Sequence, residues 1–385
     1  MKSTTVISTA IALALICSPA IATSDESGQS ASLQEHWEPY RPWKEPISTY
    51  AAMNKPDVYA WQLFVALNWP VSPSSCKPDH YKVLGDPGAT TWESWIAREQ
   101  VYLPFAAKPE RWSENCKNGS DAALPVGSYS TGDDDTVKMN HRTYKYIRDN
   151  KLYSLDEQER LAKAGVRDVD FPIGSKEIKA YWVVITEADK PRYHWVETER
   201  DGNKVIYGLS ALHIMSKDNP IWFWSTFEHV DNEHIWPSVY PEAFRGWTVP
   251  SKDSTACPVD NLACNKIPAG FGLKGTKWEN YRLRGTQIDW IDNRGNPTIL
   301  TNSQIEGALD QQSVSCVTCH ALAVKGVSGD PMPIPLETEE VNDEGFHYSF
   351  VGSPKQEFFT DENGEPVPYL GLDYVWSLRH AQREK

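Results

Sequence analysis

The sequence predicts an α+β fold, in which a large aromatic-rich domain with an antiparallel sheet precedes a small, mainly helical C-terminal domain. Two observations carry this prediction. Between residues 176 and 228, β-branched and aromatic segments alternate with short turn sequences, a pattern typical of antiparallel strands. Elsewhere, two segments combine helical apolar spacing with residues that begin and end helices. The length of 385 residues favours two domains or one large one.

The two helical segments are "PDVYAWQLFVALNW", which begins at Pro56, and "SLDEQERLAKAG", which covers residues 154–165. In the first, Pro and Asp precede apolar residues at helical spacing, as they do at the start of many helices. In the second, we expect Ser154 to be the N-cap, Glu157 to complete a capping box and Gly165 to end the helix.

The predicted sheet is formed by residues 176–186, 192–200, 204–215 and 221–229. The connections "EADKP", "DGN" and "SKDNP" are rich in turn-forming residues. Because short turns usually join neighbouring strands, we expect these segments to form a four-stranded antiparallel meander. Residues 278–300 are expected to add strands before the C-terminal domain.

Composition limits the classes of function. The formal net charge of −14 argues against nucleic acid as a partner, because phosphate binding needs clustered Lys and Arg. Hydrophobic residues make up 40% of the chain and charged residues 23%, so a packed core is expected. The 16 Trp and 17 Tyr residues favour large cores in a β-rich domain, with an aromatic-lined binding cleft as the alternative.

The first 22 residues have the pattern of a secretory signal peptide. Lys2 provides the positive start, residues 6–16 are apolar, and Ala20–Ala22 match a small-residue cleavage site, so the mature chain is expected to begin at Thr23. A lipoprotein anchor at Cys17 is disfavoured, since a bulky Ile precedes it. No later run reaches the roughly 18 apolar residues that a membrane span needs. We therefore expect an exported, periplasmic protein without a membrane span.

Export determines how the cysteines are interpreted. In an oxidising compartment, cysteines usually pair, and cleavage at residue 22 leaves an even number of them. Cys257 and Cys264 close the short loop "CPVDNLAC" and are expected to form one disulfide. Without the pair near the C-terminus, Cys76 and Cys116 remain and are expected to form the other. Both disulfides are hypotheses, because sequence alone does not fix connectivity.

The pair near the C-terminus belongs to "SCVTCHALA", residues 315–323. Cys316, Cys319 and His320 form a C-x-x-C-H motif, the attachment pattern of c-type haem. Two intervening residues on a helical turn place the thiols at the separation of the two haem vinyl groups, and His320 then faces the iron. By chance, the motif is expected only roughly 0.003 times in a chain of this composition.

Other interpretations of the motif are weaker. A structural zinc site needs four ligands, and the sequence has no second C-x-x-C or H-x-H group. A thioredoxin-like redox pair would follow a strand in a βαβ unit and would not need the histidine. A disulfide across two residues is strained.

On these residues, 301–385 resembles a monohaem c-type cytochrome domain. "CVTCH" follows "NSQIEGALDQQS", and "GLDYVWSLRHAQ" is similar to the C-terminal helix that packs against the attachment helix in class I cytochromes c. Residues 23–300 are similar to uncharacterised bacterial exported proteins through "WQLFVALNWP" and "WFWSTFEHVDN", a likeness that implies no activity. With the signal peptide at residues 1–22, the expected organisation is a mixed α+β domain over 23–300 and a domain over 301–385 that the resemblance implies to be cytochrome c-like, with one covalent haem.

The sixth iron ligand departs from the family pattern. Class I domains usually place an axial Met tens of residues after the histidine, whereas Met332 follows His320 by only twelve. Met332 stands in "DPMPIP", which resembles the usual ligand loop, and it is the expected metal ligand opposite His320. His347 and His380 are alternatives, as is an open or water-bound iron.

The segment "FEHVDNEH" holds the candidate catalytic residues Glu228 and His229, followed by Glu233 and His234, while His213 stands on the preceding strand. Beside an open iron, Glu228 or His229 could move a proton from peroxide. In the alternative interpretation, these polar groups are hydrogen-bonded and fasten the sheet to a loop or to the C-terminal domain.

The primary functional expectation is an exported haem c protein that passes single electrons to an unidentified redox partner protein. One alternative is a haem peroxidase or oxygenase, whose pocket for a small-molecule substrate lies between the two domains. Another makes the Trp-rich domain a ligand-binding or docking module that carries the haem.

Overall fold

The computed structural model describes residues 41–112, 136–200, 202–232, 267–292, 294–306, 314–327, 341–342, 345–346, 351–361 and 363–385. The described residues from Arg41 to Lys385 belong to one compact unit, and the division at residue 300 stays a prediction. In the part of the chain that is described, no helix is both long enough and apolar enough to cross a membrane.

The α-helices are α1 (Thr49–Asn54), α2 (Pro56–Leu67), α3 (Arg98–Val101), α4 (His141–Asp149), α5 (Leu155–Lys163) and α7 (Cys316–His320). The 3-10 helices are η1 (Pro104–Ala106), η3 (Lys277–Asn280), η5 (Gln356–Phe359) and η6 (Trp376–His380). The strands are β1 (Ile96–Ala97), β2 (Thr136–Met139), β3 (Lys176–Val184), β4 (Trp195–Arg200), β5 (Asn203–Ser216), β6 (Phe223–His229), β7 (Tyr281–Gln287), β8 (Val324–Gly326), β9 (Val341–Asn342), β10 (Gly345–Phe346) and β11 (Tyr369–Gly371).

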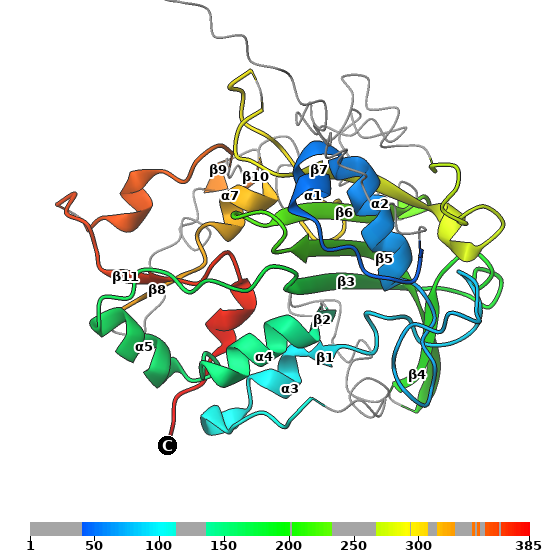
Figure 1. Cartoon of the computed structure of the whole chain (residues 1–385), viewed down its shortest axis with the longest axis horizontal. Helices are drawn as coiled ribbons and strands as arrows, with labels where there is room; N and C mark the ends of the chain where they lie inside the picture. Colours follow the sequence, from blue (N-terminus) through cyan, green and yellow to red (C-terminus); the bar gives the residue numbers. More distant parts are fainter. Residues whose placement is uncertain are drawn as a thin grey trace, which may run out of the picture. The chain divides into compact units, whose positions relative to one another are not determined.

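Within the described ranges, seven strands form one antiparallel sheet in the order β1-β2-β3-β5-β6-β7, with β4 paired to β5 (Figure 1). The predicted strands exist, but the predicted meander order is wrong, because β3 pairs with β5 rather than with β4. The reason is the length of β5. Its first half pairs with β4, and its second half, from Ala211, pairs with β6. Strands β4 and β6 therefore lie one after the other along the same edge of β5.

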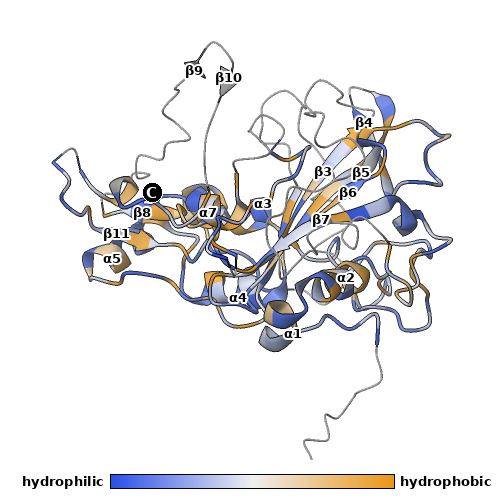
Figure 2. Ribbon diagram, turned by 90° about the horizontal axis from the view of Figure 1, so that it is seen from above, coloured by the Kyte–Doolittle hydropathy of each residue, from blue (hydrophilic) through white to orange (hydrophobic). Residues whose placement is uncertain are grey.

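One face of the sheet packs against α2, which begins at Pro56 as predicted (Figure 1). Phe64 of α2 stacks on Phe227 of β6 with ring centroids 4.3 Å apart. Tyr59 meets Phe223 edge to face at 5.0 Å. Figure 2 shows the apolar residues running along the central strands and α2. Burial of these rings makes this the larger aromatic core of the molecule.

The opposite face of the sheet packs against α7 and the C-terminal segment. Side chains alternate along a strand, so Phe223 enters the α2 core while the next residue, Trp224, enters a second core. Cys316, Val317 and Leu378 belong to this second core. The C-x-x-C-H helix is therefore built onto the sheet, in the same core as residues that precede position 300.

The tryptophans mostly fill these cores, which confirms the core interpretation for the described part of the chain. Buried tryptophans are Trp61, Trp69, Trp92, Trp95, Trp182, Trp222, Trp224 and Trp278.

The second predicted helix is α5, and Ser154 caps it by accepting a hydrogen bond from the Glu157 amide at 3.3 Å. The capping box is incomplete, because the Glu157 carboxylate binds Arg160 instead. Gly165 follows with φ of 80°, as expected at a helix end.

A mainly helical C-terminal domain is not confirmed. After residue 300, the described elements are α7, η5, η6 and the short strands β8 to β11. The segment likened to a C-terminal helix begins at Gly371, the last residue of β11, which pairs with β8. Asp373 and Tyr374 then have φ of 49° and 65°, which a continuous right-handed helix does not allow.

Candidate haem attachment site

The C-x-x-C-H motif forms a single helical turn. Ser315 is the N-cap of α7 and accepts a hydrogen bond from the Thr318 amide at 3.3 Å. The Thr318 hydroxyl donates to the Gly352 carbonyl at 2.7 Å, and the Val317 amide donates to the Gln287 side chain of β7 at 2.9 Å. The two residues between the cysteines thus fix the helix to its surroundings. Cys316 and Cys319 are both free thiols.

The surroundings of both thiols favour the protonated form. Burial, reinforced by the nearby Glu306 carboxylate, raises the pKa of Cys316 well above its usual value and that of Cys319 to about 12. Redox-active and zinc-binding cysteines instead need a stabilised thiolate. Among the residues that the structure describes, no group of three or more His, Cys, Asp or Glu could hold a metal ion. The raised pKa values weigh against the redox-pair interpretation.

His320 is a neutral imidazole with a defined tautomer. Its Nδ1 lies 2.7 Å from the backbone oxygen of Tyr374, and because a carbonyl can only accept, Nδ1 carries the proton. Burial lowers the pKa of His320 to about 4. Within the described ranges, Nε2 has no hydrogen-bond partner. A histidine that donates through one nitrogen to a backbone carbonyl and keeps the other free is the usual state of a metal-binding imidazole.

The carbonyl that orients His320 belongs to the left-handed turn at Asp373 and Tyr374. Such φ values are uncommon for residues other than glycine, so the surroundings must hold the turn in place. The Asp373 carboxylate accepts from Lys217 Nζ at 2.6 Å and from the Phe171 amide at 2.8 Å. Sequence reasoning gave these residues no role, because a backbone carbonyl and its supports leave no motif.

The sheet supplies the other neighbours of His320. The Trp224 ring of β6 lies 4.4 Å from the imidazole, centroid to centroid, at an interplanar angle of 55°. His213 of β5 lies 3.3 Å from Glu306, and Lys179 is its cross-strand neighbour on β3. The charges of His213, Lys179 and Glu306 all affect the pKa of His320. Charged groups from two strands therefore surround the motif.

The predicted catalytic residue Glu228 is buried in a saturated network. One carboxylate oxygen accepts from the Ser303 amide at 2.8 Å and lies 3.3 Å from Arg284 Nε. The other accepts from Asn232 at 3.1 Å and from the Ser303 hydroxyl. These bonds join β6 to residues 302–304, which corresponds to the interpretation of Glu228 as a structural group that fastens the sheet to a loop.

His229 points away from Glu228, because adjacent residues of β6 face opposite sides of the sheet. Its ring stacks on Tyr193 with centroids 3.6 Å apart, and Nε2 donates to the Arg192 carbonyl at 3.1 Å. The structure does not bring Glu228 and His229 together at one site. Glu233 and His234 lie outside the described residues.

Several other predicted groups also lie outside the described residues: the signal peptide, Cys17, Cys116, Cys257, Cys264, Met332 and His347. Cys76 is disulfide-bonded, and the identity of its partner stays a prediction. His380 is exposed at the end of η6, with Nε2 3.5 Å from Arg98.

Comparisons of the chain with protein-family models, with curated proteins and with solved structures found no match. The functional assignment of the site therefore depends on the residues themselves and on the geometry around α7.

Proposed function

We propose that the protein is an exported c-type haem protein that transfers single electrons to a redox partner protein. The observation that carries the proposal is the state of residues 316–320. Two free thiols lie on one helical turn, and the following histidine is neutral, with Nδ1 donating to the Tyr374 carbonyl and Nε2 left over. This donor set fits one covalent haem c.

The chain's own groups have defined tasks in this proposal. Cys316 and Cys319 would hold the haem, each through a thioether in which the sulfur bonds to one vinyl carbon and the thiol hydrogen passes to the other. No oxidant or reductant is needed for that addition. His320 would present Nε2 to the iron, and the hydrogen bond from Nδ1 to the Tyr374 carbonyl would hold the orientation of its ring. Bound haem supplies the ferric–ferrous couple for one-electron transfer.

The surroundings of α7 suit a carrier. Trp224 packs on the imidazole, and burial of this core restricts the access of water on that side. Low polarity and fixed hydrogen bonds determine how strongly each oxidation state is favoured. In this proposal, the segment after residue 300 acts as the cytochrome c-like part, although it is built onto the sheet.

The enzymatic alternative receives less support. A peroxidase needs a base that reaches the open side of the iron. The carboxylate of Glu228 is already engaged by Ser303, Asn232 and Arg284, and His229 faces the opposite side of the sheet. These contacts favour structural roles for both residues. The sixth iron position is the property that separates carrier from enzyme, and we propose Met332 for it.

Covalent attachment is tested by extraction with acidified acetone after expression in a host that attaches haem in its periplasm. Wild type should keep its colour in the protein pellet. Cys316→Ser and Cys319→Ser should each leave one thioether, with a shifted reduced spectrum, and the double variant should release all colour. Thr318→Ser, which changes the motif without removing a thiol, is the control. Release of pigment from wild type would reject the proposal.

A further inference from the structure

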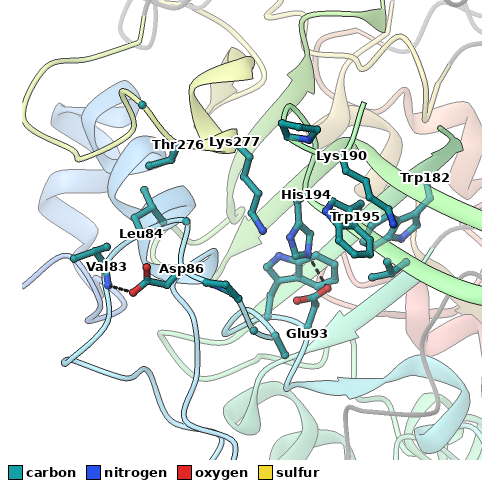
Figure 3. A pocket seen from close by; sticks show the side chains of 18 of the residues that line it. Val83, Leu84, Asp86, Glu93, Trp182, Lys190, His194, Trp195, Thr276 and Lys277 are labelled. Atoms are coloured by element: carbon teal, nitrogen blue, oxygen red, sulfur yellow. Dashed lines mark hydrogen bonds and ion pairs between the residues drawn. The ribbon is translucent and has the colours of Figure 1, made fainter. Parts of the chain in front are cut away.

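A second site lies on the α2 side of the sheet, among residues that share no core with α7. It is an open cavity of about 890 Å³. The loop 83–89, Trp92 and Glu93 form one side, the start of β4 forms another, and residues 275–277 close the third (Figure 3). Cavities of roughly 300–1,000 Å³ are the usual size of small-molecule sites.

A Glu–His pair, with His194 buried and Glu93 half-buried, lies at the base of this cavity. Glu93 accepts from Nε2 of His194 at 2.8 Å (Figure 3). It also accepts from the Thr90 amide at 2.6 Å. Burial alone would raise the pKa of Glu93, but His194 and the Thr90 amide outweigh it and lower the value to about 2. Burial lowers the pKa of His194. At neutral pH, the carboxylate is therefore charged and the imidazole is neutral.

Charged side chains of both signs line the cavity around this pair. The lining contains three lysines but only two carboxylates, Asp86 and Glu93. Lys138 donates to the backbone oxygen of Glu93, and Lys190 is paired with Glu187 and Glu197 outside the lining. Both of these ammonium groups are thus occupied.

Lys277 differs from the other two lysines. In the part of the chain that is described, no ion pair joins its ammonium to a carboxylate, and the ammonium is 5.3 Å from the centre of the Trp278 ring. Burial lowers the pKa of Lys277, while the charge of Glu93 acts on it from a longer distance and partly offsets that lowering. Figure 3 shows its side chain extending toward His194. A half-buried ammonium without a carboxylate partner in a cavity attracts an anionic ligand group.

The remaining wall is aromatic. Trp195 is 38% exposed at the mouth of the cavity, and the nearly buried Trp182 lies behind it. Lys190 lies over the Trp195 ring at 4.1 Å and helps to fix its orientation. An exposed indole held in place offers a flat apolar surface to a ligand ring.

We propose that this cavity binds a small aromatic carboxylate, with the carboxylate at Lys277 and the ring against Trp195. The anionic group satisfies the ammonium, and the planar apolar body covers the indole. This site is separate from α7, so the proposal does not depend on haem.

The test is calorimetric titration of the full mature protein with benzoate and with benzamide, its uncharged analogue of similar shape. Benzoate should bind at least about tenfold more tightly than benzamide, because a charge-assisted hydrogen bond replaces a neutral one. Lys277→Gln should abolish that preference, whereas Lys277→Arg should keep it. Lys274→Gln is the matched control, since it removes the same charge from an exposed position three residues away that does not line the cavity.

Equal affinities of wild type for benzoate and benzamide, or no heat with benzoate at millimolar concentration, would overturn the proposal. So would an unchanged preference in Lys277→Gln, or the same loss in Lys274→Gln. If circular dichroism shows that Lys277→Gln does not fold, the proposal is tested by the preference of wild type for benzoate over benzamide and by whether Lys277→Arg keeps that preference. Loss of haem binding in the cysteine variants would not affect any of these outcomes.

Discussion

Nδ1 of His320 lies 2.7 Å from the carbonyl oxygen of Tyr374, a residue 54 positions further along the chain. This contact couples the C-x-x-C-H turn to a backbone segment in an uncommon conformation. Since the segment is held by the ion pair of Lys217 and Asp373, a residue with no part in any motif supports the orientation of the proposed iron ligand.

Lys217→Met should lower the free energy of unfolding by about 3 kcal/mol, because it leaves the buried Asp373 carboxylate without its partner. Denaturant titration of the holoprotein measures this loss. Lys145→Met, which breaks an exposed pair with Asp149, is the control and should have little effect. Similar stability for both variants would mean that the turn at residues 373–374 does not depend on the ion pair.

The pH dependence of stability should show the contribution of Glu177. Burial raises the pKa of this carboxyl from 4.5 to about 7, so between these values the folded state keeps a proton that the unfolded state has lost. The free energy of unfolding contributed by Glu177 therefore falls as pH rises through this window, by about 3 kcal/mol in total.

Glu177→Gln should remove that fall, and its stability relative to wild type should rise between pH 4.5 and 7. The hydrogen bond from Ser377 survives, since the amide oxygen also accepts. Urea titrations across this range measure the difference between the two curves. Glu199→Gln, at an exposed position of β4, should give a curve parallel to that of wild type. A parallel curve for Glu177→Gln as well would contradict the prediction.

Met332→Ala should convert the visible spectrum from low-spin to high-spin or water-bound, because the thioether is the proposed sixth ligand. Ferrous Met332→Ala should also bind carbon monoxide, which wild type should not. An unchanged spectrum would move the assignment to His347 or His380, each tested by its own Ala variant. A wild type that is already high-spin would favour the enzymatic alternative.

Glu228→Gln should destabilise the protein without changing peroxide turnover. The variant leaves the buried Arg284 guanidinium without the carboxylate 3.3 Å away, a loss of about 3 kcal/mol. Chemical denaturation and a peroxidase assay on the same preparation provide the two readings. A selective loss of turnover at unchanged stability would instead restore Glu228 as a catalytic residue.

The sequence predicted local features of the fold better than the arrangement of its strands. Ser154 and Pro56 begin helices as expected, because caps and first-turn prolines act within one turn. The strand order was missed, since it depends on β5 being long enough to hold β4 and β6 on one edge. Turn sequences report which strands exist, but not which edge each one occupies.

The candidate site was likewise predicted only in part. The residues of the motif could be recognised in the sequence because the proposed covalent attachment of haem would require this spacing. The supports of His320 were not, since Tyr374 acts through its backbone and Trp224 through packing. The cavity at Lys277 and His194 was missed for a similar reason, because residues far apart in sequence converge there only after folding.

The central claim is tested most directly by the intact mass of the wild-type protein, expressed from the full sequence with residues 1–22 in a host that attaches haem. The account predicts the mass of the chain from Thr23 plus one haem, with the added mass on the peptide that contains Cys316, Cys319 and His320. A mass equal to that of the polypeptide alone, with both thiols open to alkylation, would contradict it.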